Sequence, residues 1–230
     1  MRGYYIKAVF FDFNGVIADD ERLHWKLFNE IVSRFNISVS FKDYLDKFLG
    51  LNDIDAFSLI LKNAGNKLSK KELGELVREK ASFYQKKAPS CTSVYKSTLR
   101  FLKTIPKNLI VGIVSGALRE EIKVFLNLYD LTHTFHFIIA AEDTYKGKPN
   151  PEGYQKAFDK AFTLSASINL KPYECLSIED SKEGILAAKF AGLKTLGLMH
   201  TYCANHIKDA DIILPHLARF TFKDIDLLIK

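Results

Sequence analysis

The feature that most constrains the fold is an aspartate, Asp12, which directly follows the apolar run of residues 5–11 and precedes Gly15 by three positions. An apolar run of this length is typical of a buried strand. Placing a carboxylate beside such a strand is costly unless a metal, a cation or hydrogen bonds compensate its charge. The sequence therefore predicts a polar site at the carboxyl end of this strand.

Polar residues also close three later apolar runs. They are Ser115-Gly116 after residues 109–114, Gly147-Lys148-Pro149 after residues 137–140, and Glu179-Asp180 after residues 175–178. In an open parallel sheet the carboxyl ends of the strands meet in one crevice, which is the usual ligand site of this architecture. We therefore expect these residues to gather around Asp12.

Composition and charge exclude several classes of protein. The chain has 230 residues, of which 47% are hydrophobic and 26% charged, as in ordinary globular proteins. Its net charge of +6 comes from scattered lysines that form no block longer than a pair, so we expect no nucleic-acid partner. Three widely spaced cysteines fit neither a disulfide framework nor a zinc site. With no signal peptide and no apolar stretch of about 18 residues, we expect a cytoplasmic protein that does not bind membranes.

Helical periodicity dominates residues 21–87. Apolar side chains recur every fourth residue from Leu23 to Phe35, a second helix is expected to end near Gly65, and a third to end before Pro89. After residue 94, short apolar runs alternate with helical stretches, which predicts a doubly wound parallel sheet with helices on both faces. We expect an α/β core made of residues 1–16 and 95–230, with a small helical cap, residues 17–94, inserted over its polar edge.

The polar residues at the strand ends suit phosphoryl transfer through an aspartyl phosphate. A carboxylate attacks phosphorus only when its repulsion by the phosphate oxygens is cancelled, and Mg²⁺ held by Asp12 and Asp180 would do much of this. Lys148 would add a second positive charge. The hydroxyl of Ser115 and backbone N–H groups after Gly116 would donate hydrogen bonds to the phosphoryl oxygens.

At these residues the chain resembles the haloacid dehalogenase superfamily, in the branch with a helical cap that includes β-phosphoglucomutase-like proteins and small phosphatases. Four motifs appear in the family's order, and they are residues 11–17, 113–116, 147–151 and 178–181. The resemblance implies that Asp12 is the nucleophile, that Ser115 and Lys148 hold the phosphoryl group, and that Asp180 with Glu179 serves a Mg²⁺ ion. It also implies that the backbone carbonyl of residue 14 is a metal ligand.

Position 14 departs from the family's pattern. Family phosphatases have an aspartate there that protonates the leaving group, whereas this chain has Asn14, whose amide cannot carry that proton. Loss of such a group typically lowers the rate by about 10² to 10⁴. Three explanations are open: an enzyme that uses another acid or an easy leaving group, a protein that binds phosphorylated ligands without turning them over, and a chain altered to trap a complex.

Two further residues are candidates for substrate contacts. His24 lies on the apolar arc of the first cap helix, where it is either an interface histidine, a substrate contact or a replacement proton carrier. Arg119 follows Ser115 by four residues and could contact a phosphate, pair with Glu120 or Glu121, or face solvent.

The sequence thus predicts a Mg²⁺-dependent phosphatase that acts on a small phosphorylated metabolite. The alternatives are a catalytically silent phosphate-binding protein and a phosphosugar mutase. The segment of residues 49–53 lacks the basic side chains that a sugar bisphosphate would need, which argues against the mutase. Neither the substrate nor the oligomeric state follows from the sequence.

Overall fold

The protein, analysed as a computed structural model that describes residues 5–49, 51–165 and 169–229, is built on a parallel sheet. The sheet has six strands in the order β5-β4-β1-β6-β7-β8. Their bounds are β1 Ala8–Phe11, β4 Ile110–Val114, β5 Phe137–Ile139, β6 Cys175–Glu179, β7 Lys194–Leu198 and β8 Ile212–Leu214. Strand β1 pairs with β4 on one side and with β6 on the other, so Asp12 emerges from the centre of the sheet.

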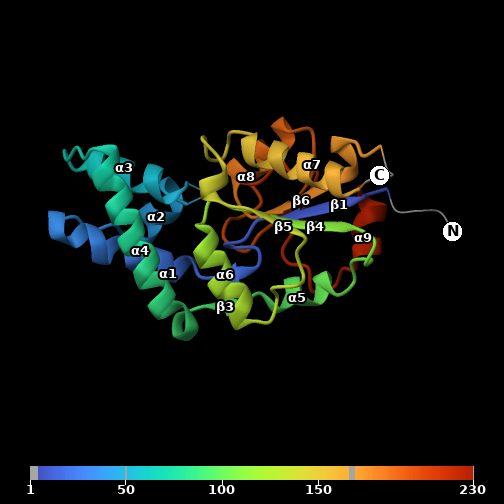
Figure 1. The fold of residues 1–230 in the computed structure, drawn as a ribbon, viewed down its shortest axis with the longest axis horizontal. Coiled ribbons are helices and arrows are strands. Elements are labelled where there is room, and N and C mark those ends of the chain that lie inside the picture. The colour runs from blue at the N-terminus through green and yellow to red at the C-terminus, as the bar shows by residue number, and fades with distance from the viewer. Residues whose placement is uncertain (1–4, 50, 166–168, 230) are drawn as a thin grey trace.

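Helices cover both faces of the sheet (Figure 1). One face carries α5 (Lys96–Leu102), α6 (Arg119–Leu128) and α9 (Phe222–Leu228), and the other carries α7 (Glu152–Leu164) and α8 (Lys182–Phe190). Side chains of β1 alternate between the two cores: Val9 and Phe11 pack with the first group of helices, Ala8 and Phe10 with the second. This alternation explains why β1 is apolar throughout, since a strand covered on both faces has no solvent side. The predicted α/β fold class is confirmed.

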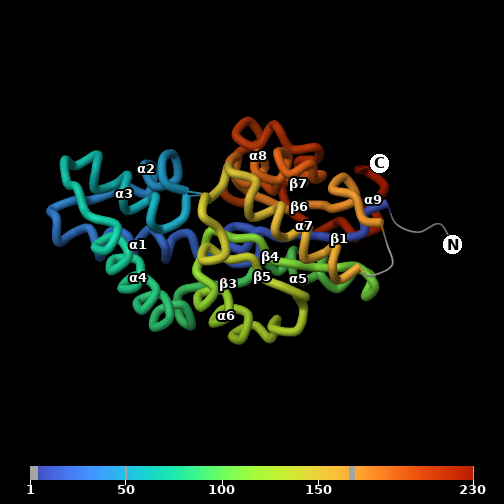
Figure 2. Tube along the Cα trace, turned by 45° about the horizontal axis from the view of Figure 1, so that its top comes forward, coloured from blue at the N-terminus to red at the C-terminus, as the bar shows by residue number. Residues whose placement is uncertain are grey.

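A helical insertion follows β1. It contains α1 (Glu21–Val32), α2 (Phe41–Lys47), α3 (Asp53–Asn63) and α4 (Lys70–Cys91), with its own apolar core. Two short antiparallel strands, β2 (Ala18–Asp19) and β3 (Ser93–Val94), pair where the chain enters and leaves it. Short 3₁₀ turns lie at Ser33–Phe35, Ala141–Asp143 and Pro172–Glu174. Figure 2 shows the insertion at one end of the sheet and α9 at the other.

The third insertion helix continues past the point where we expected it to end. Pro89 lies inside α4, which ends at Cys91. A proline inside a helix removes one backbone hydrogen bond. Here the helix is retained because Tyr84 and Ala88 are fully buried against α1, and Thr92 N–H donates to the Ala88 carbonyl at 3.1 Å. The packing of the residues before the proline, together with this hydrogen bond across it, therefore outweighs the expected break.

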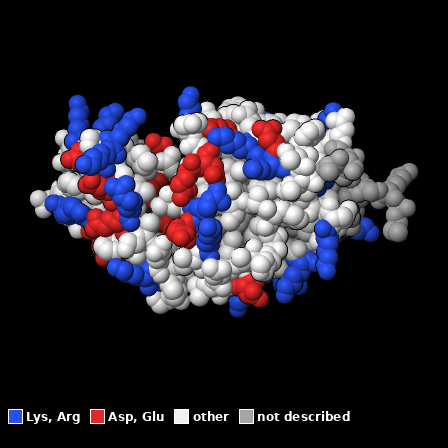
Figure 3. Space-filling view, in the orientation of Figure 1, with Lys and Arg blue, Asp and Glu red and all other residues white. Residues whose placement is uncertain are grey.

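None of the helices within the described ranges has the length and apolar character needed to cross a membrane. On the face shown in Figure 3, acidic side chains gather where the insertion meets the sheet domain, whereas lysines and arginines are spread over the insertion and the lower edge.

Candidate active site

The four predicted strand-end residues line one small cavity between the sheet and the insertion. Asp12, Ser115, Lys148 and Asp180 all contribute to its wall. Parallel pairing explains the convergence: Asp12 N–H donates to the Ile178 carbonyl and Ser115 N–H to the Ile139 carbonyl, each at 2.9 Å. The cavity measures about 60 Å³, which is less than the roughly 150 Å³ that accommodates a benzene molecule.

Lys148 lies between two acids of the cavity. Its ammonium nitrogen is 2.9 Å from Asp12 Oδ1 and 2.6 Å from Glu179 Oε1, and it also donates to the Val114 carbonyl at 3.2 Å. Burial alone would lower the Lys148 pKa, but the carboxylates of Asp12 and Glu179 more than offset this and raise it. Lys148 therefore keeps its positive charge beside Asp12. An anionic substrate would need such a positive charge at this place.

Asp12, Glu179 and Asp180 form an acidic group that fits a divalent cation. One carboxylate oxygen of each lies within 4.8 Å of the others. Burial raises the pKa of Glu179 to about 7 and raises that of Asp180 well above its ordinary value, with Asp12 adding to both shifts. Carboxylate oxygens are the ligands that Mg²⁺ prefers, so the residues present fit that ion.

Within the acidic group, Glu179 is already held by protein donors. Its side chain is fully buried and accepts hydrogen bonds from Lys148 and from the Tyr154 hydroxyl. Asp180 accepts one from the Thr201 hydroxyl. Asp12 and Asp180 line the cavity, whereas Glu179 lies behind it. The geometry therefore favours Asp12 and Asp180 as the direct metal ligands and Glu179 as the residue that positions Lys148.

Two glycines make room for these acids. Gly15 has a φ of +74°, and a Cβ atom there would lie 1.9 Å from Asp180 Oδ2. A Cβ at Gly184 would lie 2.0 Å from Glu179 Oε2. Helix α8 is capped by Ser181, whose hydroxyl accepts from Gly184 N–H at 3.1 Å. Capping by Ser181 leaves the Asp180 carboxylate available to the cavity.

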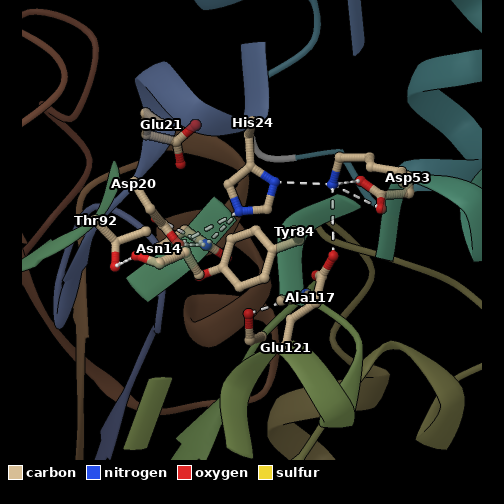
Figure 4. A network of polar contacts seen from close by, with 12 residues as sticks. Asn14, Asp20, Glu21, His24, Asp53, Tyr84, Thr92, Ala117 and Glu121 are labelled. Carbon is tan, nitrogen blue, oxygen red and sulfur yellow. Dashed lines mark hydrogen bonds and ion pairs between the residues drawn. The ribbon is translucent and has the colours of Figure 1, made fainter. Parts of the chain in front are cut away.

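Asn14 also lines the cavity, but its amide points to a buried acid (Figure 4). Its nitrogen donates to both carboxylate oxygens of Asp20 at 3.0 Å. The hydroxyl of Tyr84 donates to Asp20 Oδ2 at 2.6 Å, and His24 Nε2 lies 3.4 Å from the same oxygen. Burial alone would raise the Asp20 pKa, but His24, Tyr84 and Asn14 together lower it. Asp20 is therefore a carboxylate that these donors keep ionised.

The structure places His24 between two charged groups. Its Nδ1 lies 2.8 Å from the Lys80 ammonium, and its Nε2 lies near Asp20 and 3.1 Å from the Asn14 nitrogen. An ammonium group can only donate, so Nδ1 accepts and the ring proton is on Nε2, which faces Asp20. His24 thus borders the cavity, and each of its ring nitrogens has a partner within the protein. This is the arrangement of an interface histidine, one of the three alternatives that the sequence left open.

Arg119 does not join the other predicted residues. Its guanidinium pairs with Asp143 and donates to the Ile138 carbonyl at 3.2 Å. It is not among the residues that line the cavity, whereas the neighbouring Gly116 and Glu121 are. The pairing with Glu120 or Glu121 that the sequence left open is not formed either. Of the segment 49–53, Gly50 lies outside the described residues, and Leu49, Leu51 and Asp53 line the cavity.

Sequence reasoning missed a buried cation that the insertion places next to the cavity. Lys80 is fully buried and lies 2.8 Å from both carboxylate oxygens of Asp53 and 3.9 Å from Glu121. A signal was present, because Lys80 follows the helical spacing of Leu73, Leu76 and Tyr84. A lysine on such an apolar face indicates a buried cation that needs an acidic partner.

Glu21 is a second missed residue. It lines the cavity and accepts a hydrogen bond from the Tyr44 hydroxyl at 2.6 Å. Burial raises its pKa to about 7, and the neighbouring acids Asp20 and Asp12 add to the shift while His24 opposes it. An acidic residue in the first turn of a helix is common because it complements the helix dipole, so nothing in the sequence distinguished Glu21 from a solvent-exposed acid.

Comparison with known proteins agrees with this architecture. The family model described as haloacid dehalogenase-like hydrolase matches residues 9–198. The chain is 28% identical to the β-phosphoglucomutase of Bacillus subtilis (strain 168), over 84% of this chain and 83% of that protein. It is 25% identical to hexitol phosphatase B of Escherichia coli (strain K12), over 96% of each.

The solved structures agree at the level of the fold. The crystal structure of a β-phosphoglucomutase from Clostridium difficile superposes with a TM-score of 0.79 at 24% identity, covering 97% of both chains. The family match spans the segments that carry Asp12, Ser115, Lys148 and Asp180. With its parallel sheet, its helical insertion and this match over most of its length, the chain belongs to the haloacid dehalogenase-like hydrolase family.

Proposed function

We propose that the protein is a Mg²⁺-dependent phosphatase of small phosphorylated metabolites that works through a phosphorylated Asp12. The observation that carries this proposal is the position of Lys148, whose nitrogen contacts both Asp12 and Glu179 beside the acidic group. When bound, Mg²⁺ would supply further positive charge to the phosphoryl oxygens. The relatives named as a hexitol phosphatase and a β-phosphoglucomutase support a substrate of this class.

The residues of the chain divide the chemistry between them. Asp12 Oδ attacks phosphorus, the bond from phosphorus to the ester oxygen breaks, and the leaving alcohol takes up a proton. Lys148 and the Ser115 hydroxyl hold the phosphoryl oxygens, and Ser115 is oriented because its oxygen accepts from Ala117 N–H at 3.0 Å. Water then attacks the aspartyl phosphate, releasing inorganic phosphate and restoring Asp12.

A proton carrier other than Asn14 is required, and Glu21 is the residue that best meets the requirement. It shares the cavity with Asp12, and its pKa of about 7 suits a group that exchanges protons near neutral pH. His24 is less suitable because its Nδ1 accepts from Lys80 and its Nε2–H faces Asp20. The proposal therefore assigns the proton transfer to Glu21.

The two rival functions make different demands on the cavity. A silent binding protein would need the same Lys148 and Ser115 but no proton carrier, so turnover separates it from the proposal. A phosphosugar mutase would need cations for a second phosphate. Among the described residues that line the cavity, Lys148 is the only lysine or arginine. At the end of the cavity next to the insertion lie three acids instead, Glu21, Asp53 and Glu121. That charge distribution favours the phosphatase.

A phosphatase screen with Mg²⁺ tests the proposal, run on the native protein and on Asp12→Asn. We expect turnover of at least one phosphate monoester by the native protein and its loss in Asp12→Asn, since an amide is not the nucleophile. Asp19→Asn is the matched control, because Asp19 is an exposed aspartate in β2. Absence of turnover in the native protein, or full activity in Asp12→Asn, would overturn the proposal.

A further inference from the structure

The end of the cavity next to the insertion is lined by three carboxyl groups that the proposed mechanism does not place on the phosphate. They are Glu21 at the start of α1, Asp53 at the start of α3 and Glu121 on α6, and we call them the acidic pole. In Figure 4, Asp53, Glu121 and His24 lie around a shared nitrogen atom, which is the ammonium of Lys80. The pole lies where α4 of the insertion packs against α6 of the sheet domain.

Lys80 is the cation next to the acidic pole, but its hydrogen bonds are already used. An ammonium group has three donors. In Lys80 these reach Asp53 Oδ1, Asp53 Oδ2 and His24 Nδ1, each at 2.8 Å. Glu121 Oε1 is 3.9 Å from the same nitrogen, beyond hydrogen-bond distance. Lys80 therefore reduces the net negative charge of the acidic pole, but it donates no hydrogen bond to Glu121 Oε1.

Glu121 is left with a buried oxygen that has no hydrogen-bond partner among the described residues. Its side chain is only 1% exposed, and Oε1 is the unpaired atom. Burial raises the Glu121 pKa, and the Lys80 charge only partly opposes that shift. Buried polar atoms without partners are rare in folded proteins, and each calls for a water, an ion, a ligand or a functional reason. Here the atom belongs to a residue that lines the cavity.

A metal ion does not fit this pole. Among residues 5–49, 51–165 and 169–229, the acids close enough to share an ion are Asp12, Glu179 and Asp180 at the opposite end. A second phosphate does not fit either, because it would meet three carboxyl groups and an ammonium whose donors are already taken. What the pole lacks is a compact cation that donates hydrogen bonds.

We propose that the acidic pole binds an ammonium group of the substrate, so that the preferred substrates are phosphate monoesters of amino alcohols or amino sugars. This inference rests on the proposed function, since it assigns the phosphate to Asp12, Ser115 and Lys148. The ammonium then donates to Glu121 Oε1, and Glu21 and Asp53 provide the surrounding negative potential. The same charges reject a substrate with a phosphate at both ends.

Non-hydrolysable ligands test the inference without requiring turnover. The probes are ω-aminoalkylphosphonates with two, three or four carbons, each compared with the alkylphosphonate that has a methyl group in place of the ammonium. Calorimetric titrations with Mg²⁺ are expected to show at least about tenfold tighter binding of the amino member at one of the lengths, which corresponds to about 1.4 kcal/mol. Equal affinities at every length would overturn the proposal.

Two variants identify the residue responsible. Glu121→Gln keeps the shape of the side chain but removes its charge, and we expect the preference for the amino ligand to fall to nearly onefold. Glu120→Gln makes the same change at an exposed neighbour on α6 and should leave the preference intact. If Glu121→Gln does not fold, Glu21→Gln provides a second test, with a partial loss of preference expected. An unchanged preference in whichever of these two variants is folded would remove the acidic pole from recognition.

The two proposals fail in distinguishable ways. Turnover of phosphate monoesters without any preference for amino ligands would leave the phosphatase standing and overturn the ammonium site. Preferential binding of the aminoalkylphosphonates without turnover of any ester would support the ammonium site and overturn the proposed phosphatase activity. Ethanolamine phosphate and ethylene glycol monophosphate form the corresponding pair for kcat/KM.

Discussion

The side-chain nitrogen of Asn14 lies 3.0 Å from both carboxylate oxygens of Asp20, inside a layer that also includes Tyr84 and His24. Asp20 is only 1% exposed, so the amide supplies a hydrogen bond that this buried carboxylate needs. An aspartate at position 14 would instead set two carboxylates against each other. Asn14 is thus the hydrogen-bond donor that the buried Asp20 carboxylate requires. The effect on activity of replacing Asn14 therefore depends on Asp20.

Restoring an aspartate should therefore work fully only in a double variant. In Asn14→Asp/Asp20→Asn the new carboxyl can exchange a proton without repulsion from Asp20, and we expect turnover to rise, but by less than the roughly 10² to 10⁴ that a general acid and base usually contributes, because Glu21 already carries the proton in the native protein. In Asn14→Asp alone the rise should be smaller, because the pair of acids shifts one pKa strongly upward. Steady-state kcat on a phosphate monoester measures both. A full gain in the single variant, with none added by Asp20→Asn, would contradict the coupling.

Asp180→Ala should weaken Mg²⁺ binding. Loss of residues that merely support a metal ligand lowers affinity by about 10- to 100-fold, so loss of a direct ligand should lower it by ~100-fold or more. Calorimetric titration of Mg²⁺ provides the measurement. Asp159→Ala, at an exposed position of α7, is the control and should bind Mg²⁺ normally. Unchanged affinity in Asp180→Ala would remove this residue from the metal site.

Lys80→Met should destabilise the fold strongly. It leaves the carboxylates of Asp53 and Glu121 in a buried region without their cation, and breaking a buried pair in this way typically costs about 3–5 kcal/mol. The same change at Lys87, which pairs with Glu30 on the surface, should cost ~1 kcal/mol or less. Urea unfolding of both variants gives the two free energies. Similar values would show that Lys80 is not structurally important.

The Glu21 carboxyl should make stability depend on pH. Its pKa is about 7 in the folded protein against an ordinary value of 4.5, so between these values the folded state binds more protons than the unfolded state. Stability from this group therefore falls as pH rises through the window, by at most about 1.4 kcal/mol per unit. Tyr44, Asp20, His24 and Asp12 surround the group, and all are retained in the test.

Glu21→Gln removes this contribution. Urea unfolding at pH 5 and pH 7 should therefore show a smaller loss of stability in Glu21→Gln than in the native protein. The exposed Glu30 provides the control, since Glu30→Gln should keep the native slope. An identical slope in all three proteins would show that burial does not perturb Glu21, and would weaken its assignment as the proton carrier.

The fold and part of the site could be predicted because they depend on local patterns. Alternating apolar runs and helical stretches are enough to predict a parallel sheet, and the ends of parallel strands must converge at one edge. Asp12, Ser115, Lys148 and Asp180 therefore meet as expected. The predicted end of the third insertion helix was wrong because a proline rule considers one residue, whereas the packing of Tyr84 and Ala88, which both precede Pro89, retains the helix.

The acidic pole and the Asn14–Asp20 contact were decided by tertiary structure. His24 and Lys80 touch although 56 positions separate them, and Lys80 meets Glu121 only because α4 packs on α6. Such contacts depend on the rotation of each helix about its axis and on how the insertion sits on the sheet, which no local pattern specifies. By itself the sequence determined the parallel sheet, the helical insertion and the gathering of Asp12, Ser115, Lys148 and Asp180 at one end of the cavity. Only the packing of helices decided which buried charges face its other end.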